Sequence, residues 1–340
     1  MDVKYPAEAD LDRLLAVGPR MVSTALGPME YAEAGEGPVL MSVHGSYGGW
    51  DYGLGMAAVY ALNGFRVIAP SRPGFLGTPL SSGRTYEEQA DALAALLAAL
   101  GIERAAVLAF SGGGPPTFLL AARHPERVGC LVEVSALSTA FPPLKGVNRL
   151  LWAIGESRVG LGAFMALLRT LVVRRPTWGL AISMGEETAK SRAEIVALAR
   201  RIVDDPYRWA FVKKVYAGVS AHRVGARFPG QKNDNALMLG VRSLPLADVG
   251  CPTLLVGGTA DRLREHVEFA GTAIPEAELR WVPGGGHRGF WLNDDFAEHQ
   301  AYTLAWLHEH SRHARHSLAP GQRTSDVRAT GHERSDRETT

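Results

Sequence analysis

The stretch AAVLAFSGGGPPTFLLAARHP, residues 105–125, places a single serine, Ser111, at an abrupt change of pattern. A short apolar run precedes this serine, and three glycines, two prolines and an apolar segment with helical spacing follow it. Short apolar runs bounded by turn residues are typical of buried strands. The stretch therefore predicts a strand that passes directly into a helix, with the Ser111 hydroxyl at the turn between them.

The same alternation of strands and helices extends along most of the chain. The short runs rich in β-branched residues are nearly continuous in apolar character, which suits strands covered on both faces. These predicted strands are Met29–Ala34, Val39–His44, Arg66–Pro70, Ala105–Phe110, Val128–Ser135, Thr253–Gly257 and Glu278–Val282. The predicted helices between them are Trp50–Asn63, Thr85–Leu100, Pro115–Arg123, Arg264–Ala273 and Phe296–His310. The pattern predicts an α/β fold with a mostly parallel sheet.

The alternation stops between residues 136 and 246, where no run has the character of a strand. Helical spacing predicts helices there at Val147–Glu156, Gly162–Val173, Ala189–Val203 and Tyr207–Val215. Because strands resume after Cys251, we interpret this segment as a helical insertion. The predicted domains are a core (residues 1–135 and 247–311), a helical cap (136–246), and a polar, charged tail (312–340) with too few apolar residues to fold.

Charge and composition exclude several classes of protein. The 340 residues include 36 Lys and Arg against 35 Asp and Glu, a balance that gives no reason to expect nucleic acid or acidic membranes as partners. Cys130 and Cys251 are far apart and lack the spacing of a metal site. The N-terminus lacks the apolar core of a secretory signal, and charged residues interrupt the most apolar stretch, residues 150–173. We therefore expect a cytoplasmic globular protein without membrane insertion, and its oligomeric state stays open.

The residues around Ser111 indicate a specific chemistry. A tight strand-to-helix turn forces strained backbone angles on its central serine and exposes the hydroxyl as a nucleophile. The N–H groups at the start of the helix suit a developing negative charge on an oxygen. Compared with the G-x-S-x-G motif of such turns, the chain has A-F-S-G-G, with Ala109 in place of the first glycine. A phosphate-binding loop or an ordinary turn is the alternative, although the dinucleotide motif G-x-G-x-x-G would need a third glycine in place.

Three further segments supply possible partners for this serine. VLMSVHGSYGGWD (39–51) ends a strand and continues into a glycine-rich loop, where Ser46 could present a second N–H group. PTLLVGGTADRL (252–263) ends a strand before Asp261, and LRWVPGGGHRGFW (279–291) presents His287 after three glycines. The chain order Ser, Asp, His is the one known for this kind of turn. His44 is interpreted as a residue that fixes its loop by hydrogen bonds.

The chain from about Met29 to His310 resembles an α/β-hydrolase with a helical cap. Besides the segments above, APSRPGFLGTPL (69–80), LAARHPERV (120–128) and SLPLADVGCPTLLVGGTAD (243–261) are similar to ordered motifs of that family. The resemblance implies that Ser111 attacks a carbonyl carbon, His287 takes its proton and Asp261 orients His287. It also implies that the backbone N–H groups of Ser46 and Gly112 hold the oxyanion. Neither a metal nor a cofactor is expected.

The apolar cap segment suggests the character of the substrate. Pockets for small molecules are mostly hydrophobic, so Trp152, Phe164, Met165 and Leu168 are predicted to line an apolar pocket over Ser111. The same side chains could instead only pack the cap. The leading hypothesis is hydrolysis of a carboxylic ester with a medium-sized apolar acyl or alcohol group, followed by hydrolysis of a thioester or lactone. Cleavage of a carbon–carbon bond by the same residues, and a ligand-binding protein without turnover, are the alternatives.

Overall fold

The computed structural model describes residues 2–140, 156–185, 187–216, 224–240 and 243–316, with side chains up to Ser311. Its centre is an eight-stranded sheet in the order β1-β2-β4-β3-β5-β6-β7-β8. Strands β3 to β8 run parallel, whereas β1 and β2 are antiparallel to their neighbours. The strands are β1 (Arg20–Thr24), β2 (Gly27–Ala34), β3 (Val39–Val43), β4 (Arg66–Pro70), β5 (Ala105–Phe110), β6 (Val128–Val134), β7 (Thr253–Gly258) and β8 (Glu278–Val282).

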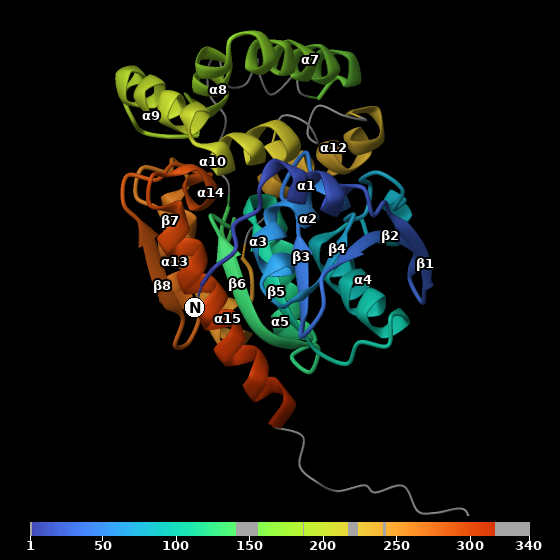
Figure 1. The fold of residues 1–340 in the computed structure, drawn as a ribbon. Coiled ribbons are helices and arrows are strands. Elements are labelled where there is room, and N and C mark those ends of the chain that lie inside the picture. The colour runs from blue at the N-terminus through green and yellow to red at the C-terminus, as the bar shows by residue number, and fades with distance from the viewer. Residues whose placement is uncertain (1, 141–155, 186, 217–223, 241–242, 317–340) are drawn as a thin grey trace, which may run out of the picture.

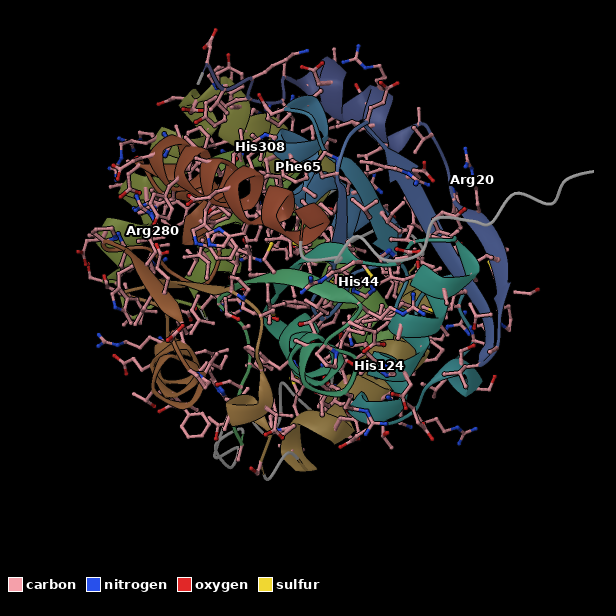
Figure 2. All side chains as sticks on the ribbon, turned by 90° about the horizontal axis from the view of Figure 1, so that it is seen from below. Arg20, His44, Phe65, His124, Arg280 and His308 are labelled. Atoms are coloured by element: carbon pink, nitrogen blue, oxygen red, sulfur yellow. The ribbon has the colours of Figure 1, made fainter. Side chains whose placement is uncertain are left out.

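Helices cover both faces of this sheet, and each face has its own apolar core. Side chains of α1, α2, α3 and α15 pack in one core, and those of α4, α5 and α13 pack in the other. On the first face, the His308 ring of α15 lies 4.6 Å from the Phe65 ring, and Figure 2 shows the two together. These helices are α1 (Glu8–Leu15), α2 (Trp50–Met56), α3 (Ala58–Leu62), α4 (Tyr86–Ala99), α5 (Gly114–Arg123), α13 (Arg264–Ala273), α14 (Gly289–Leu292) and α15 (Phe296–His316).

A second group of helices lies together beyond one end of the sheet and forms the cap (Figure 1). They are α7 (Arg158–Arg174), α8 (Pro176–Gly185), α9 (Arg192–Asp204), α10 (Pro206–Phe211) with a π-helical turn (Val212–Tyr216), and α12 (Val224–Gly240). The insertion interrupts the core between β6 and β7, as the sequence predicts. Among the helices of the described ranges, none has both the length and the apolar content that crossing a bilayer requires.

The α/β-hydrolase fold predicted from the sequence is confirmed, with all seven predicted strands present. Strand β1 was not predicted because its five residues, RMVST, lie half-exposed or exposed and have no apolar run. It forms one edge of the sheet and β8 the other, so that Arg20 and Arg280 lie on opposite sides of the molecule in Figure 2. The exact limits of the core and cap domains remain predictions.

The helices agree less closely with the predicted ranges. The helix predicted at Trp50–Asn63 is divided at Ala57 into α2 and α3. Helix α15 continues to His316, past the predicted start of the tail at residue 312. The predicted helix Val147–Glu156 lies outside the described residues, apart from Glu156. Helices α1, α8, α12 and the short α14 were not predicted; α12 contains Pro229 and many polar residues, which conceal its periodicity.

The parallel strands bring the predicted site residues to one edge. Strands β3, β5, β7 and β8 all point the same way, and His44, Ser111, Asp261 and His287 each follow the end of one of them. In a parallel sheet the loops at the carboxyl ends of the strands are neighbours, and ligands bind there. The helical insertion also leaves the sheet at this edge, after β6, so the cap covers the loops (Figure 1).

A buried carboxyl group lies inside the sheet next to this edge. Glu133 of β6 is 1% exposed, and its Oε1 lies 2.5 Å from the Thr117 hydroxyl of α5. Among the described residues, Oε2 of Glu133 has no hydrogen-bond partner. Burial raises the pKa of Glu133 well above its usual range, although the bond with Thr117 opposes the shift. A protonated Glu133 can donate to Thr117, whose own hydroxyl can then donate to the Gly113 carbonyl at 2.8 Å.

Replacing Glu133 by glutamine is expected to stabilise the protein, and more so at higher pH. The folded protein retains a proton that the unfolded chain releases above about pH 4.3, so its free energy of unfolding falls as pH rises, by at most about 1.4 kcal/mol per pH unit. Glutamine does not titrate, so the Glu133→Gln protein does not lose free energy of unfolding in this way as pH rises. Melting temperatures measured at about pH 5.5 and about pH 8 test the difference. The exposed Glu103→Gln is the control, and an equal effect of Glu133→Gln at both pH values would show that Glu133 is ionised.

Candidate active site

Ser111 occupies a sharp turn between β5 and α5. Its φ of +53° lies in the left-handed region, which is costly for a residue other than glycine. The strand end is packed tightly against the neighbouring loop: a Cβ atom on Gly113 would lie 2.9 Å from the carbonyl oxygen of His44. The small residues after Ser111 therefore make this turn possible, and the turn directs the hydroxyl out of the end of the sheet.

His287 joins Ser111 to Asp261. Its Nε2 lies 2.9 Å from Ser111 Oγ, and its Nδ1 lies 2.9 Å from Asp261 Oδ2. A carboxylate only accepts hydrogen bonds, so Nδ1 carries the proton and Nε2 is free to accept from the hydroxyl. The structure thus brings together three residues that lie 150 and 26 positions apart in the chain.

The loops of Asp261 and His287 are packed against each other. A Cβ atom on Gly258, at the end of β7, would lie 2.2 Å from the carbonyl oxygen of Gly285. Only glycine at this position therefore allows the His287 loop to approach. Asp261 is 2% exposed and also accepts a hydrogen bond from the Leu263 amide at 2.9 Å, which fixes its carboxylate.

The electrostatics of the pair favour a charged carboxylate and a basic imidazole. Burial alone would raise the pKa of Asp261, but the charge and hydrogen bond of His287 and the bonds from Leu263 and Ser135 outweigh it and lower the pKa. Burial alone would lower the pKa of His287. The carboxylates of Asp261 and Glu187 outweigh this effect, so the pKa of His287 is raised above its usual value. An imidazole of this kind can take a proton from Ser111.

The two predicted amide donors lie beside each other. A Cβ atom on Gly112 would lie 3.4 Å from the backbone nitrogen of Ser46, which places the β3 loop against the start of α5. Among the described residues, no hydrogen bond uses the N–H group of Ser46. The helix N-terminus adds a favourable dipole for an anion. An oxygen that acquires negative charge next to Ser111 would therefore find two N–H donors nearby.

His44 fixes the loop that carries Ser46, in agreement with its interpretation from the sequence. Its Nε2 accepts the Arg72 N–H at 3.0 Å, so Nδ1 donates to the Gly45 carbonyl at 2.7 Å. Burial, and then the charge of Arg72, lower its pKa well below the usual value for histidine. His44 is therefore a neutral residue with both ring nitrogens occupied.

The cap contributes a segment to the site that the sequence did not indicate. The Glu187 carbonyl accepts a bond from the His287 amide at 3.3 Å, and the Ala189 amide donates to the Ala260 carbonyl at 2.8 Å. The Glu187 carboxylate also forms an ion pair with Arg288 at 2.6 Å. The cap therefore contacts the loops of both Asp261 and His287. A glutamate between two predicted helices gives no sequence signal for such a contact.

The predicted pocket residues are less well placed. Trp152 lies outside the described residues, Phe164 is 51% exposed, Leu168 is half-buried, and only Met165 is buried. A cavity that reaches His287 is lined by residues of the cap and of the core, and the described residues Phe164, Met165 and Leu168 are not among them. Its apolar lining side chains are Met184, Ile195, Leu198 and Leu292.

Aromatic side chains surround the site on the core side. The Phe110 ring lies 5.0 Å from the His287 ring and 5.1 Å from the Trp291 ring, and Tyr52 lies 6.5 Å from Phe110. Three arginines that contact the site loops are paired with carboxylates. These pairs are Arg72–Asp234, Arg227–Asp51 and Arg288–Glu187.

Comparisons with known proteins agree with the fold. The model of the family described as alpha/beta hydrolase fold matches residues 38–294. The chain is 33% identical over 290 residues to "Uncharacterized hydrolase YcgS" of Bacillus subtilis, covering 83% of this chain and 95% of that protein. It is 30% identical over 288 residues to a 2-hydroxy-6-oxononadienedioate/2-hydroxy-6-oxononatrienedioate hydrolase of Comamonas testosteroni, covering 77% and 86%.

A solved structure extends the likeness to three dimensions. An alpha/beta hydrolase fold protein from Nakamurella multipartita superposes with a TM-score of 0.77 at 35% identity, covering 87% of this chain and all of that one. The family match spans both segments of the core and the cap between them. From its sheet, its inserted helices and these matches, the chain belongs to the alpha/beta hydrolase fold family.

Proposed function

We propose that the protein is a serine hydrolase that cleaves a carboxylic ester through an acyl-enzyme on Ser111. The observation that carries this proposal is the pair of 2.9 Å contacts of His287, one to Ser111 and one to Asp261. A serine hydroxyl is a weak nucleophile unless a base takes its proton, and the base must be held in the correct tautomer by a third group. The three side chains have the geometry for these roles.

The proposed reaction has two steps. Ser111 Oγ bonds to the carbonyl carbon while its proton passes to His287 Nε2, and the carbonyl oxygen becomes an oxyanion. The intermediate then expels the alcohol oxygen, which takes the proton from His287 as it leaves. In the second step a water gives a proton to His287 and attacks the acyl-enzyme, and Ser111 leaves with that proton as the acid is released.

The oxyanion is proposed to bind the N–H groups of Ser46 and Gly112. The nearness of the two residues supports this role, as does the N-terminus of α5 behind Gly112. Hydrogen-bond donors fixed in advance stabilise the transition state, and losing one costs about 10²–10³-fold in kcat in comparable enzymes. Asp261 is proposed to stabilise the imidazolium form of His287 in both steps.

The surroundings support an apolar, uncharged substrate. Phe110 lies next to His287, Trp291 and Tyr52 lie next to Phe110, and three arginines that contact the site loops already have carboxylate partners. A neutral ester, thioester or lactone with an apolar acyl group needs no cation for recognition. We therefore propose uncharged substrates of this kind in preference to substrates that carry a carboxylate.

A second candidate reaction is the hydrolysis of a carbon–carbon bond. The names of several relatives support it, among them the Comamonas testosteroni hydrolase of an oxononadienedioate. Such substrates carry carboxylates, which the paired arginines would not bind without giving up a partner. Rates on p-nitrophenyl esters of graded chain length and on a 2-hydroxy-6-oxo-dienoate distinguish the two. Turnover of the dienoate alone would replace the ester proposal.

Replacing Ser111 by alanine is expected to abolish ester hydrolysis and leave the fold intact. The change removes one oxygen, and the expected loss in kcat is about 10³-fold or more. Wild-type protein should also form a fluorophosphonate adduct on Ser111, located by mass spectrometry. Ser23→Ala, on strand β1, is the matched control. Equal rates for Ser111→Ala and wild type would exclude Ser111 as the nucleophile.

Replacing Glu187 by glutamine is expected to extend activity to lower pH. His287 must be neutral to act as a base, so kcat/KM falls as pH drops through its raised pKa. The Glu187 charge contributes to that raised pKa, and its removal also leaves the opposing charge of Arg288 unpaired. Both effects lower the pKa of His287. Profiles of kcat/KM between about pH 5 and about pH 8 measure the shift, with the exposed Glu298→Gln as control. An acid limb that does not move would show that Glu187 has no influence on His287.

A further inference from the structure

Helix α12 of the cap turns a stripe of polar side chains toward the core. Arg227, Gln231 and Asp234 are spaced by one and two helical turns and are each at most 2% exposed. The buried face of a helix is normally apolar, because burying polar groups is costly unless each has a partner. The stripe therefore requires an explanation in terms of what these side chains bind.

All three side chains bind the loop that carries Ser46. The Ser46 hydroxyl lies 3.4 Å from Asp234 Oδ2, the Tyr47 amide donates to Gln231 Oε1 at 2.7 Å, and Arg227 donates to the Gly48 carbonyl at 2.6 Å. Successive loop residues thus pair with successive turns of one helix.

The loop has a backbone conformation that needs such support. Tyr47 has a φ of +61°, in the left-handed region, where a bulky residue other than glycine is strained. Strain of this kind costs about 1–3 kcal/mol and persists only where the surrounding structure enforces it. The hydrogen bond from the Tyr47 amide to Gln231 acts on the strained residue itself, directly after Ser46.

The orientation of Gln231 is itself fixed by a chain of hydrogen bonds. Its Nε2 donates to Asn235 Oδ1 at 2.7 Å, and Asn235 Nδ2 donates to Glu156 Oε1 at 2.7 Å. Glu156 can only accept, so each amide in the chain has one possible orientation. The acceptor oxygen of Gln231 must therefore face the loop, and these hydrogen bonds connect the loop to Glu156, two residues before α7.

We propose that Gln231 is a positioning residue that holds the Ser46 amide in place for the oxyanion. The inference rests on the proposed function, since it assigns the support of one proposed oxyanion donor to a cap residue. Gln231 holds the peptide between Ser46 and Tyr47 through the Tyr47 N–H, and this peptide adjoins the one that carries the Ser46 N–H. The oxyanion site is then complete only while the cap helix α12 is in contact with the core.

Gln231 is a better residue to test than its neighbours in the stripe. Asp234 forms a buried ion pair with Arg72, and Arg227 forms one with Asp51. Removing one partner of a buried pair leaves an uncompensated charge and destabilises the whole protein. Gln231 is uncharged, so replacing it with leucine or asparagine changes the loop contact and leaves no partner charge unpaired.

The test compares three variants of Gln231 with a matched control. Gln231→Leu removes the acceptor oxygen. Gln231→Asn shortens the side chain by one methylene, which moves the acceptor oxygen away from the Tyr47 amide, and Gln231→Glu keeps an acceptor oxygen on a side chain of the same length. Gln300→Leu is the control, because Gln300 is also buried and donates to the Phe290 carbonyl, far along the chain from the Ser46 loop. For each protein, kcat, KM, melting temperature and affinity for a phenylboronic acid, which forms a tetrahedral adduct with an active-site serine, are measured.

Gln231→Leu and Gln231→Asn are expected to lower kcat by about 10- to 100-fold with little change in KM, because only the transition state uses the oxyanion donor. Boronic acid affinity should fall by a similar factor. Gln231→Glu should recover most of both, and Gln300→Leu should change neither. If Gln231→Leu does not fold, Gln231→Asn carries the same comparison.

Two failures can be told apart. Wild-type protein that neither hydrolyses esters nor reacts with a fluorophosphonate at Ser111 would overturn the proposed function. Wild-type protein that does both, with Gln231→Leu or Gln231→Asn keeping wild-type kcat and boronic acid affinity, would overturn only the role of Gln231. A loss of melting temperature with unchanged kinetic constants would mean that the residue is purely structural.

Discussion

The site depends on a backbone that must change from strand to helix within one residue. Ser111 makes this change with a φ of +53°, and the space for it exists because Gly113 lets the end of β5 pack against the β3 loop. The same close packing places Ser46 next to Gly112. One steric condition therefore sets both the exposure of the hydroxyl and the meeting of the two amides. A larger residue at Gly113 would separate all of these groups at once.

Much of this arrangement could be predicted from the sequence, because the signals are local. Runs of apolar residues determine the strands, and the parallel order places whatever follows them at one edge. Ser111, Asp261 and His287 each follow such a run, so their meeting is predictable, whereas their roles are still to be tested. Ser46 and Gly112 also come after strands of the parallel sheet, so their position at the same edge is predictable too.

The contacts of the cap could not be predicted in this way. Gln231 binds Tyr47 across 184 positions, and Glu187 binds the His287 loop across 100. Neither lies in an apolar run, and the polar spacing of α12 is interpretable only once the helix is known to be buried. For the predicted pocket, a sequence signal was present but did not identify the lining residues. Apolar side chains of α7 suggested the lining of a pocket, but Phe164 is 51% exposed, because an apolar residue on a helix can also face solvent.

Among its contacts with the core around the site, the cap binds separate loops with separate segments: α12 binds the Ser46 loop, and Glu187 to Ala189 bind the loops of Asp261 and His287. This division limits how the insertion could be exchanged between relatives. A transplanted cap would have to bring side chains that match two loops of the host at once. Mismatch at either loop would disturb different groups, the amide donors in one case and the imidazole in the other. Cap and loops are therefore best recombined as a single unit, even though they are separated in the chain.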